Sequence, residues 1–309
     1  MKSKVRISGP EENFTCIKTH SDFMPYIGAH MSISGEPCMS LFRGKEAGCE
    51  VIQIFTRNQR KWFGKKLSEN EIADFFSARE KTGVNPVAIH TSYLINVASP
   101  DPDGRKKALS LLLDEMKWAE LLDIPYLVLH PGSHMGEGEK RGLTLVADTL
   151  NRANDKRPDY SVKILLETTA GQGTNLGYRF EHLAEILDMT ESAERVAICF
   201  DTCHSFAAGY DFSTKTAYRQ LINEFDKILG TDQIKAFHIN DSKTSLGSRR
   251  DRHNHLGEGF IGLHALSWFL NDPAFKERPF LLETPKGKDE NEQDMDTVNL
   301  KILRGLINK

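Results

Sequence analysis

Acidic and imidazole side chains recur at the ends of short apolar segments along this chain. Six consecutive segments of this kind end in a histidine, an aspartate or a glutamate, namely His90, His130, Glu167, Asp201, His238 and Glu283. One histidine in such a position is more often a hydrogen-bonded structural residue than a ligand. Six in succession differ, because six unpaired polar groups converging on one rim would be costly to desolvate. Metal ions would explain the choice of imidazole and carboxylate.

Three further residues extend this set. Asp201 is followed by T-C-H, which places His204 just beyond the same segment, and a later D-R-H motif contributes Asp251 and His253. The candidates are then five histidines, two aspartates and two glutamates. A catalytic four-coordinate ion needs three protein ligands, so nine predict two or three ions. Imidazole and carboxylate donors without thiolate favour Zn²⁺ or Mn²⁺, and the sequence leaves both metals open.

Two other histidines compete for places near this set. His255 follows His253 by two residues and is the alternative ligand from the same loop. His30 ends the first apolar segment, and we expect it to line the site without binding a metal directly.

The elements that must position these residues form a repeating pattern. Eight short β-rich segments alternate with longer amphipathic ones, and they are residues 26–30, 51–55, 86–90, 126–130, 163–167, 196–201, 234–238 and 279–283. Continuous apolar runs are typical of strands buried on both faces of a parallel sheet. The intervening pattern at 105–122 predicts a helix. We therefore predict an α/β fold, a (β/α)8 TIM barrel with its active site at the carboxyl rim of the strands. An open doubly wound sheet is the structural alternative.

Composition limits the class of protein. The 309 residues contain 39% hydrophobic residues, enough for one large α/β domain, and carry a net charge of −3. We expect residues 1–25 to form an N-terminal extension and residues 26–309 to form the barrel. The five cysteines show no disulfide pattern, so we expect buried thiols in a reducing compartment. No segment has the length of a membrane span or the pattern of a signal peptide, and the expected location is cytoplasmic.

Basic residues concentrate in two predicted rim loops. The segment T-R-N-Q-R-K-W-F-G-K-K follows the second strand, and K-T-S-L-G-S-R-R-D-R follows the seventh. Charge runs are usually solvated surfaces, but these two would surround a metal pocket and suit a phosphate backbone. Trp62, Phe63, Tyr93 and Leu94 add apolar groups, which either enter a base stack or pack beneath the loops.

Several long motifs resemble those of the endonuclease IV family, the metal-dependent apurinic/apyrimidinic endonucleases. They include Y-I-G-A-H-M-S, F-T-R-N-Q-R-K-W, H-T-S-Y-L-I-N, H-P-G-S-H, D-T-C-H-S-F-A-A-G-Y-D and D-R-H-N-H-L-G-E-G, in order from Tyr26 to the end of the chain. One departure is Thr168, which stands where several relatives have asparagine beside the glutamate. The extension also lacks a counterpart in compact relatives.

The resemblance implies a trinuclear zinc site, with Mn²⁺ as an option at one position. His90, His130 and Glu167 would hold the first ion, and catalytic Glu167 would bridge to the second. Asp201, His238 and Glu283 would complete the second, and His204, Asp251 and His253 would hold the third.

The resemblance also implies a substrate. The enzyme would be a zinc-dependent hydrolase of base excision repair, a monomer that cleaves duplex DNA 5′ to abasic sites. It would leave a 3′ hydroxyl and a 5′ deoxyribose phosphate, and it would also remove blocked 3′ ends. Arg60, Tyr93 and Leu94 would enter the duplex at the lesion. Two competing hypotheses are a sugar isomerase or epimerase, which has no need of a basic collar, and a DNA-binding module without catalysis.

Overall fold

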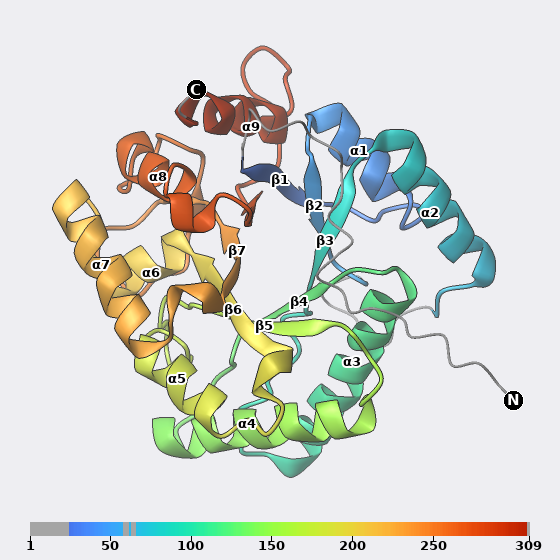
Figure 1. Ribbon diagram of the computed structural model, residues 1–309, viewed down its shortest axis with the longest axis vertical. Coiled ribbons are helices and arrows are strands. Elements are labelled where there is room, and N and C mark those ends of the chain that lie inside the picture. The colour runs from blue at the N-terminus through green and yellow to red at the C-terminus, as the bar shows by residue number, and fades with distance from the viewer. Residues whose placement is uncertain (1–24, 58–61, 63–65, 308–309) are drawn as a thin grey trace, which may run out of the picture.

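The strands of this protein form a closed parallel barrel (Figure 1). The structure, a computed structural model, describes residues 25–57, 62 and 66–307. Around the barrel the strand order is β1-β10-β7-β6-β5-β4-β3-β2. The barrel strands are β1 (Tyr26–Met31), β2 (Val51–Ile54), β3 (Asn85–His90), β4 (Tyr126–Leu129), β5 (Lys163–Glu167), β6 (Val196–Asp201), β7 (Ile234–His238) and β10 (Pro279–Leu282). The predicted TIM barrel is confirmed, the open sheet is excluded, and each strand lies within one residue of its predicted segment.

Helices cover the outside of the barrel (Figure 1). They are α1 (Met39–Ala47), α2 (Glu69–Thr82), α3 (Pro102–Leu121), α4 (Glu139–Lys156), α5 (Phe180–Asp188), α6 (Thr202–Ala208), α7 (Lys215–Ile228), α8 (Leu263–Leu270) and α9 (Met295–Leu306). The helix predicted at 105–122 is α3, which begins three residues earlier because Asp101 caps it and Pro102 occupies its first position. Short 3-10 turns, η2 (Ala193–Arg195), η3 (Thr231–Gln233) and η4 (Pro273–Phe275), precede β6, β7 and β10.

An apolar layer inside the barrel lies beneath the carboxyl rim. Side chains alternate between the two faces of a strand, so the residue two positions before each strand-end candidate, and before Gln53 in β2, also points inward. These inner residues are Val51, Ala88, Val128, Leu165, Cys199, Ala236 and Leu281, and all are buried. A separate and larger core packs the outer face of the strands against the helices. The polar side chains at the rim therefore lie directly above a layer of buried apolar side chains.

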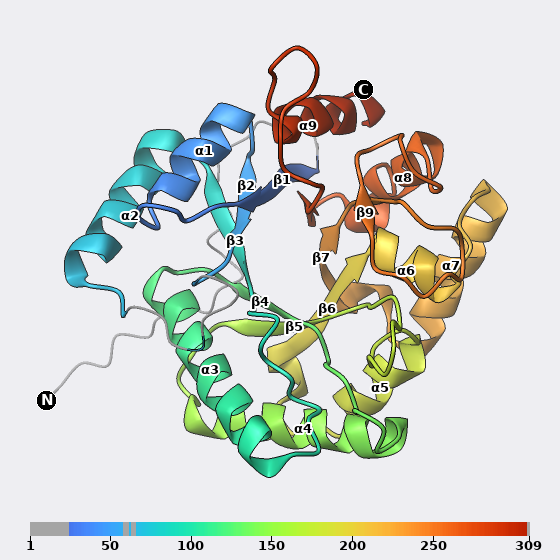
Figure 2. The ribbon, with the colours of Figure 1, turned by 180° about the vertical axis from the view of Figure 1, so that it is seen from behind.

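A small antiparallel sheet above the rim was not predicted. It pairs β8 (Asp241–Ser242) with β9 (His253–Asn254), and β9 lies beside α6 and α8 (Figure 2). Two-residue strands carry too little alternation to be recognised in a sequence.

Two further expectations concern the chain as a whole. All four cysteines in the described part of the chain are free and buried. Among the described helices, none combines the length and apolarity needed to cross a membrane. The predicted extension lies outside the described residues, apart from Pro25.

Candidate metal centre

One layer of polar side chains, with a member from every barrel strand, occupies the carboxyl rim. It consists of His30, Gln53, His90, His130, Glu167, Asp201, His238 and Glu283. The six predicted strand-end ligands all belong to it. His204, Asp251 and His253 lie against the same layer, from the first turn of α6 and the segment leading into β9. The structure thus brings all nine candidates to one mouth.

Eight of the nine candidates fall into three compact groups of potential ligand atoms. The groups are His90 with His130 and Glu167; Glu167 with Asp201, His238 and Glu283; and Asp201 with His204 and His253. Within each group the atoms lie within 4.8 Å of one another. Glu167 belongs to two groups and Asp201 to two, so the groups are contiguous.

Glu167 lies at the centre of the layer. Its Oε2 is 3.1 Å from His90 Nε2 and 3.0 Å from His130 Nε2. Its Oε1 is 2.9 Å from His238 Nδ1 and 3.2 Å from His204 Nδ1. The side chain is fully buried. Since the two oxygens face different groups, the carboxylate has the orientation required of a bridging ligand.

Three of the histidines are oriented by backbone carbonyl groups. His90 Nδ1 lies 2.8 Å from Thr91 O, His204 Nδ1 lies 2.9 Å from Thr168 O, and His253 Nδ1 lies 3.1 Å from Glu283 O. A carbonyl oxygen only accepts, so Nδ1 carries a proton in all three, and Nε2 is the nitrogen that faces the cluster. This is the usual arrangement around a metal-binding imidazole, and it fits the donor set to divalent metal ions.

Asp251 occupies the outer edge of the cluster. Its Oδ1 lies 3.1 Å from His204 Nε2 and 3.6 Å from His253 Nε2, and its side chain is 43% exposed. The most compact third group uses Asp201 instead. Asp251 is therefore placed beside the two imidazoles that the resemblance assigns to it, but in a more open position.

Buried Asp241 supports the loop around Asp251 and His253. Its carboxylate accepts hydrogen bonds from the backbone N–H groups of Ser242, Gly257, Gly259, Ile261 and Gly262. A Cβ atom at residue 259 would lie only 2.3 Å from Asp241 Oδ1, so this close approach requires glycine. The G-E-G motif therefore has a structural role in holding β9.

Burial and the charges of neighbouring residues shift the pKa values of the cluster's side chains in opposite directions. Burial favours the neutral form of Glu167, yet His130 and His238 outweigh it and hold the pKa of this carboxyl well below its usual range. Burial likewise disfavours charge on His204, but Asp201 and Asp251 raise the pKa of its imidazole well above its ordinary value. Burial lowers the pKa of His30 to about 4, so this histidine is neutral.

Neighbouring polar residues position the ligands, and the sequence pattern did not identify all of them. Thr168 Oγ1 accepts the backbone N–H of Asp201 at 2.9 Å, while Asn240 Nδ2 donates to Asp201 Oδ2 at 2.9 Å. Thr168, noted as a departure from relatives, thus contacts both Asp201 and His204. His255 instead receives a hydrogen bond from Asn299 Nδ2 at 3.1 Å, and none of the three groups contains it.

The predicted DNA-contact residues are only partly described. Arg60 lies outside the described residues. Tyr93 is 67% exposed beside the cluster, with its ring centroid 6.0 Å from that of His90. Leu94 is half-buried and packs against the core. Arg57, which belongs to the basic segment after β2, turns inward and pairs with buried Glu115 at 3.4 Å, so it does not contribute to an exposed collar.

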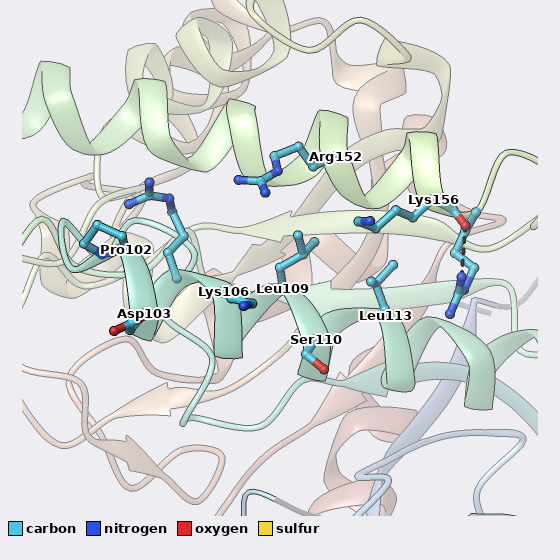
Figure 3. A pocket seen from close by; sticks show the side chains of 10 residues that line it. Pro102, Asp103, Lys106, Leu109, Ser110, Leu113, Arg152 and Lys156 are labelled. Atoms are coloured by element: carbon cyan, nitrogen blue, oxygen red, sulfur yellow. Dashed lines mark hydrogen bonds between the residues drawn. The ribbon is translucent and has the colours of Figure 1, made fainter.

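Two hollows differ in their relation to the cluster. One, of about 280 Å³, is lined by His90, Tyr93, Asn96, His130 and Ser133 among others, and so opens onto the metal-binding side chains. The other, of about 660 Å³, lies between α3 and α4 and includes Arg105, Arg152 and Lys156 (Figure 3). Only the first is lined by predicted ligands.

Comparisons with known proteins agree with this architecture. The family described as a xylose isomerase-like TIM barrel matches residues 42–301. A probable endonuclease 4 from Chloroflexus aurantiacus is 48% identical over 284 residues, covering 92% of this chain and 99% of that protein. One from Geotalea daltonii is 49% identical over 282 residues, covering 91% and 98%.

Solved structures give the same result. The crystal structure of endonuclease IV from Thermus thermophilus matches with a TM-score of 0.80 and 34% identity, covering 91% of this chain and 98% of that one. A D-tagatose 3-epimerase-like protein matches with a TM-score of 0.69 at 20% identity, which shows a shared fold alone.

The barrel and its converging side chains define a xylose isomerase-like TIM barrel with a candidate metal centre at its rim. Within that class, the chain belongs to the endonuclease IV family.

Proposed function

We propose that this protein is a metal-dependent endonuclease of base excision repair. It hydrolyses the phosphodiester bond 5′ to an abasic site in duplex DNA, leaves a 3′ hydroxyl and a 5′ deoxyribose phosphate, and cleans blocked 3′ ends. Family membership supports the nuclease activity. The observation that carries the proposal is the convergence of nine imidazole and carboxylate side chains at one rim, with buried Glu167 at their centre.

The proposed cofactor is zinc, three ions per chain. The two groups that share Glu167 would hold the first two ions, and His204, Asp251 and His253 would hold the third. Asp201 lies within reach of the second and the third ion. Bound divalent ions would lower the pKa of a water molecule to near neutrality and stabilise the charge that develops on phosphate oxygens. Mn²⁺ at one of these positions is compatible with the same donors.

The chain's own residues keep the donors ready. Glu167 is ionised because imidazoles surround it, and its two oxygens are directed toward different groups. The backbone carbonyls that accept Nδ1–H bonds hold three imidazoles in the tautomer that directs Nε2 inward. The site is thereby organised before the substrate binds. Electrostatic catalysis benefits because the charged groups need no rearrangement during the reaction.

Substrate selection would follow from the surface around the cluster. Exposed Tyr93 stands at the edge of the hollow beside His90 and His130, where it and Leu94 would fill the space left by a missing base. Arg60 would act in the same way, and exposed Lys243, Arg249 and Arg252 would bind the backbone. An abasic nucleotide costs little to extrude, and the hollow would receive its sugar. We propose a monomeric enzyme.

An incision assay tests this proposal. A synthetic duplex with one abasic analogue is incubated with the wild type and with Glu167→Gln, with and without chelator. We expect the wild type to cut and the chelated enzyme and the variant to lose incision by about 1,000-fold or more, while duplex binding persists. Wild-type enzyme that binds the duplex without cutting it, even when zinc is supplied, would contradict the proposal.

A further inference from the structure

Gln53 of β2 is the rim residue that the sequence pattern did not identify. It is fully buried, and its register partner in β1 is His30. Its Nε2 lies 2.7 Å from Glu283 Oε1 and 3.0 Å from His30 Nδ1, while its Oε1 lies 3.0 Å from His238 Nε2. One amide therefore contacts two predicted ligands and the histidine beside them.

The neighbours of this amide determine which way it points. An ionised carboxylate only accepts hydrogen bonds, so the atom 2.7 Å from Glu283 Oε1 must be the amide nitrogen. Its second N–H is available for His30 Nδ1. The amide oxygen is then left facing His238, because the opposite orientation would set two acceptors against each other.

This orientation determines the tautomer of His238. The amide oxygen accepts only, so His238 Nε2 must carry a proton, and Nδ1 is the nitrogen left to bind a metal ion in the neutral imidazole. His238 Nδ1 faces Glu167 Oε1 at 2.9 Å and Glu283 Oε2 at 3.2 Å, which is the direction of the second group. The other three oriented histidines present Nε2 and bond a backbone carbonyl through Nδ1. In His238 the two ring nitrogens exchange roles: Nδ1 faces the ligand group, and Nε2 donates to the side-chain carbonyl of Gln53, which takes the place of a backbone carbonyl.

We propose that Gln53 is a positioning residue of the group formed by Glu167, Asp201, His238 and Glu283, where it directs His238 Nδ1 and Glu283 toward a metal ion. This inference rests on the proposed function, since it assumes that the group binds a metal. It assigns to β2, one of the two barrel strands without a predicted ligand, a share in the metal site. Loss of such a supporting hydrogen bond typically weakens metal affinity by roughly 10- to 100-fold.

Metal binding by Gln53→Met tests the proposal, because methionine preserves the volume of the side chain and removes its hydrogen bonds. Wild type and variant are loaded with zinc, and the bound metal is titrated with a chelating dye. The matched control is Asn154→Leu, which removes a buried amide from α4 without touching the rim. We expect one class of ions to bind roughly 10- to 100-fold more weakly in Gln53→Met, with the control unchanged.

The outcomes separate this inference from the proposed function. Equal stoichiometry and affinity in Gln53→Met and wild type would overturn the role of Gln53 and leave the proposed function intact. A wild type that binds no zinc would overturn both. Should the variant not fold, nitrogen NMR of zinc-loaded wild type, with His238 assigned against His238→Asn, must show the proton on Nε2. A proton on Nδ1 would overturn the inference.

Discussion

The inner and outer parts of the candidate metal centre are built differently. The inner part, represented by Glu167, Asp201 and His238, comes from strand ends and is fully buried. The outer part comprises Asp251, in the loop between β8 and β9, and His253, the first residue of β9, and their side chains are 43% and 15% exposed. Barrel closure alone fixes the inner set, whereas the outer set depends on a loop that Asp241 holds. We infer that an inner ion is retained and that the outer one exchanges more readily.

Removal of an inner ligand has the largest expected effect. In His238→Asn, the group formed by Glu167, Asp201, His238 and Glu283 loses its one imidazole, and three carboxylates are left to share that site. We expect incision to fall by about 1,000-fold and zinc to raise the melting temperature less than in wild type. Steady-state incision and thermal unfolding with and without zinc measure both. A variant with wild-type incision would show that the inner group is dispensable.

Removal of an outer ligand should slow incision less than removal of an inner one. Asp251→Asn keeps the shape of the side chain but weakens its interaction with His204 and His253. We expect roughly 10- to 100-fold slower incision, which added zinc partly restores because the remaining donors still form a weaker site. Incision measured against zinc concentration provides the test. An effect as large as that of His238→Asn, and unaffected by zinc, would contradict the difference between the two parts.

Asp241, whose carboxylate holds the loop around Asp251 and His253, offers a milder way to perturb the outer part. Asp241→Asn weakens the acceptor for four backbone N–H groups within residues 257–262 without changing any ligand. We expect zinc in the outer group to dissociate several-fold faster while the inner ions remain. Stopped-flow release into a chelating dye would resolve the two phases. Equal acceleration of both phases would show that Asp241 acts on the whole barrel.

A buried carboxylate outside the three ligand groups should respond differently to pH. Burial raises the pKa of Glu115 to about 7, and the charges of Arg57 and His90 together with two hydrogen bonds offset only part of this rise. The folded state then binds more protons than the unfolded state between about pH 4.5 and about pH 7. The stability from this group is present below that window and is lost as pH rises through it.

Glu115→Gln should therefore reduce the loss of stability across this window. Urea unfolding of metal-free protein on both sides of the window provides the measurement, with exposed Glu80→Gln as the control. Identical pH slopes in wild type and Glu115→Gln would show that burial does not control this carboxyl.

The inner part of the centre was predictable because strand-end polarity repeats along the chain. A polar residue at the end of an apolar strand stands out, and barrel closure brings such ends together whatever the loops do.

Gln53 escaped prediction because it lies one residue inside its strand rather than at the end. Arg57 was expected in the basic collar, but its partner Glu115 lies 58 residues away on α3, and a charge count cannot show such pairing. The short β8–β9 sheet was missed because two-residue strands show too little alternation, and the hydrogen bonds that Asp241 accepts from residues 257–262 are not visible in a sequence.

The zinc content of the purified protein tests the central claim most directly. The wild type is loaded with zinc, freed of excess metal by gel filtration and analysed by mass spectrometry for metal per chain. If the nine side chains hold the proposed cluster, the protein retains close to three ions, and His238→Asn retains fewer. A folded wild type that retains no zinc would contradict the account.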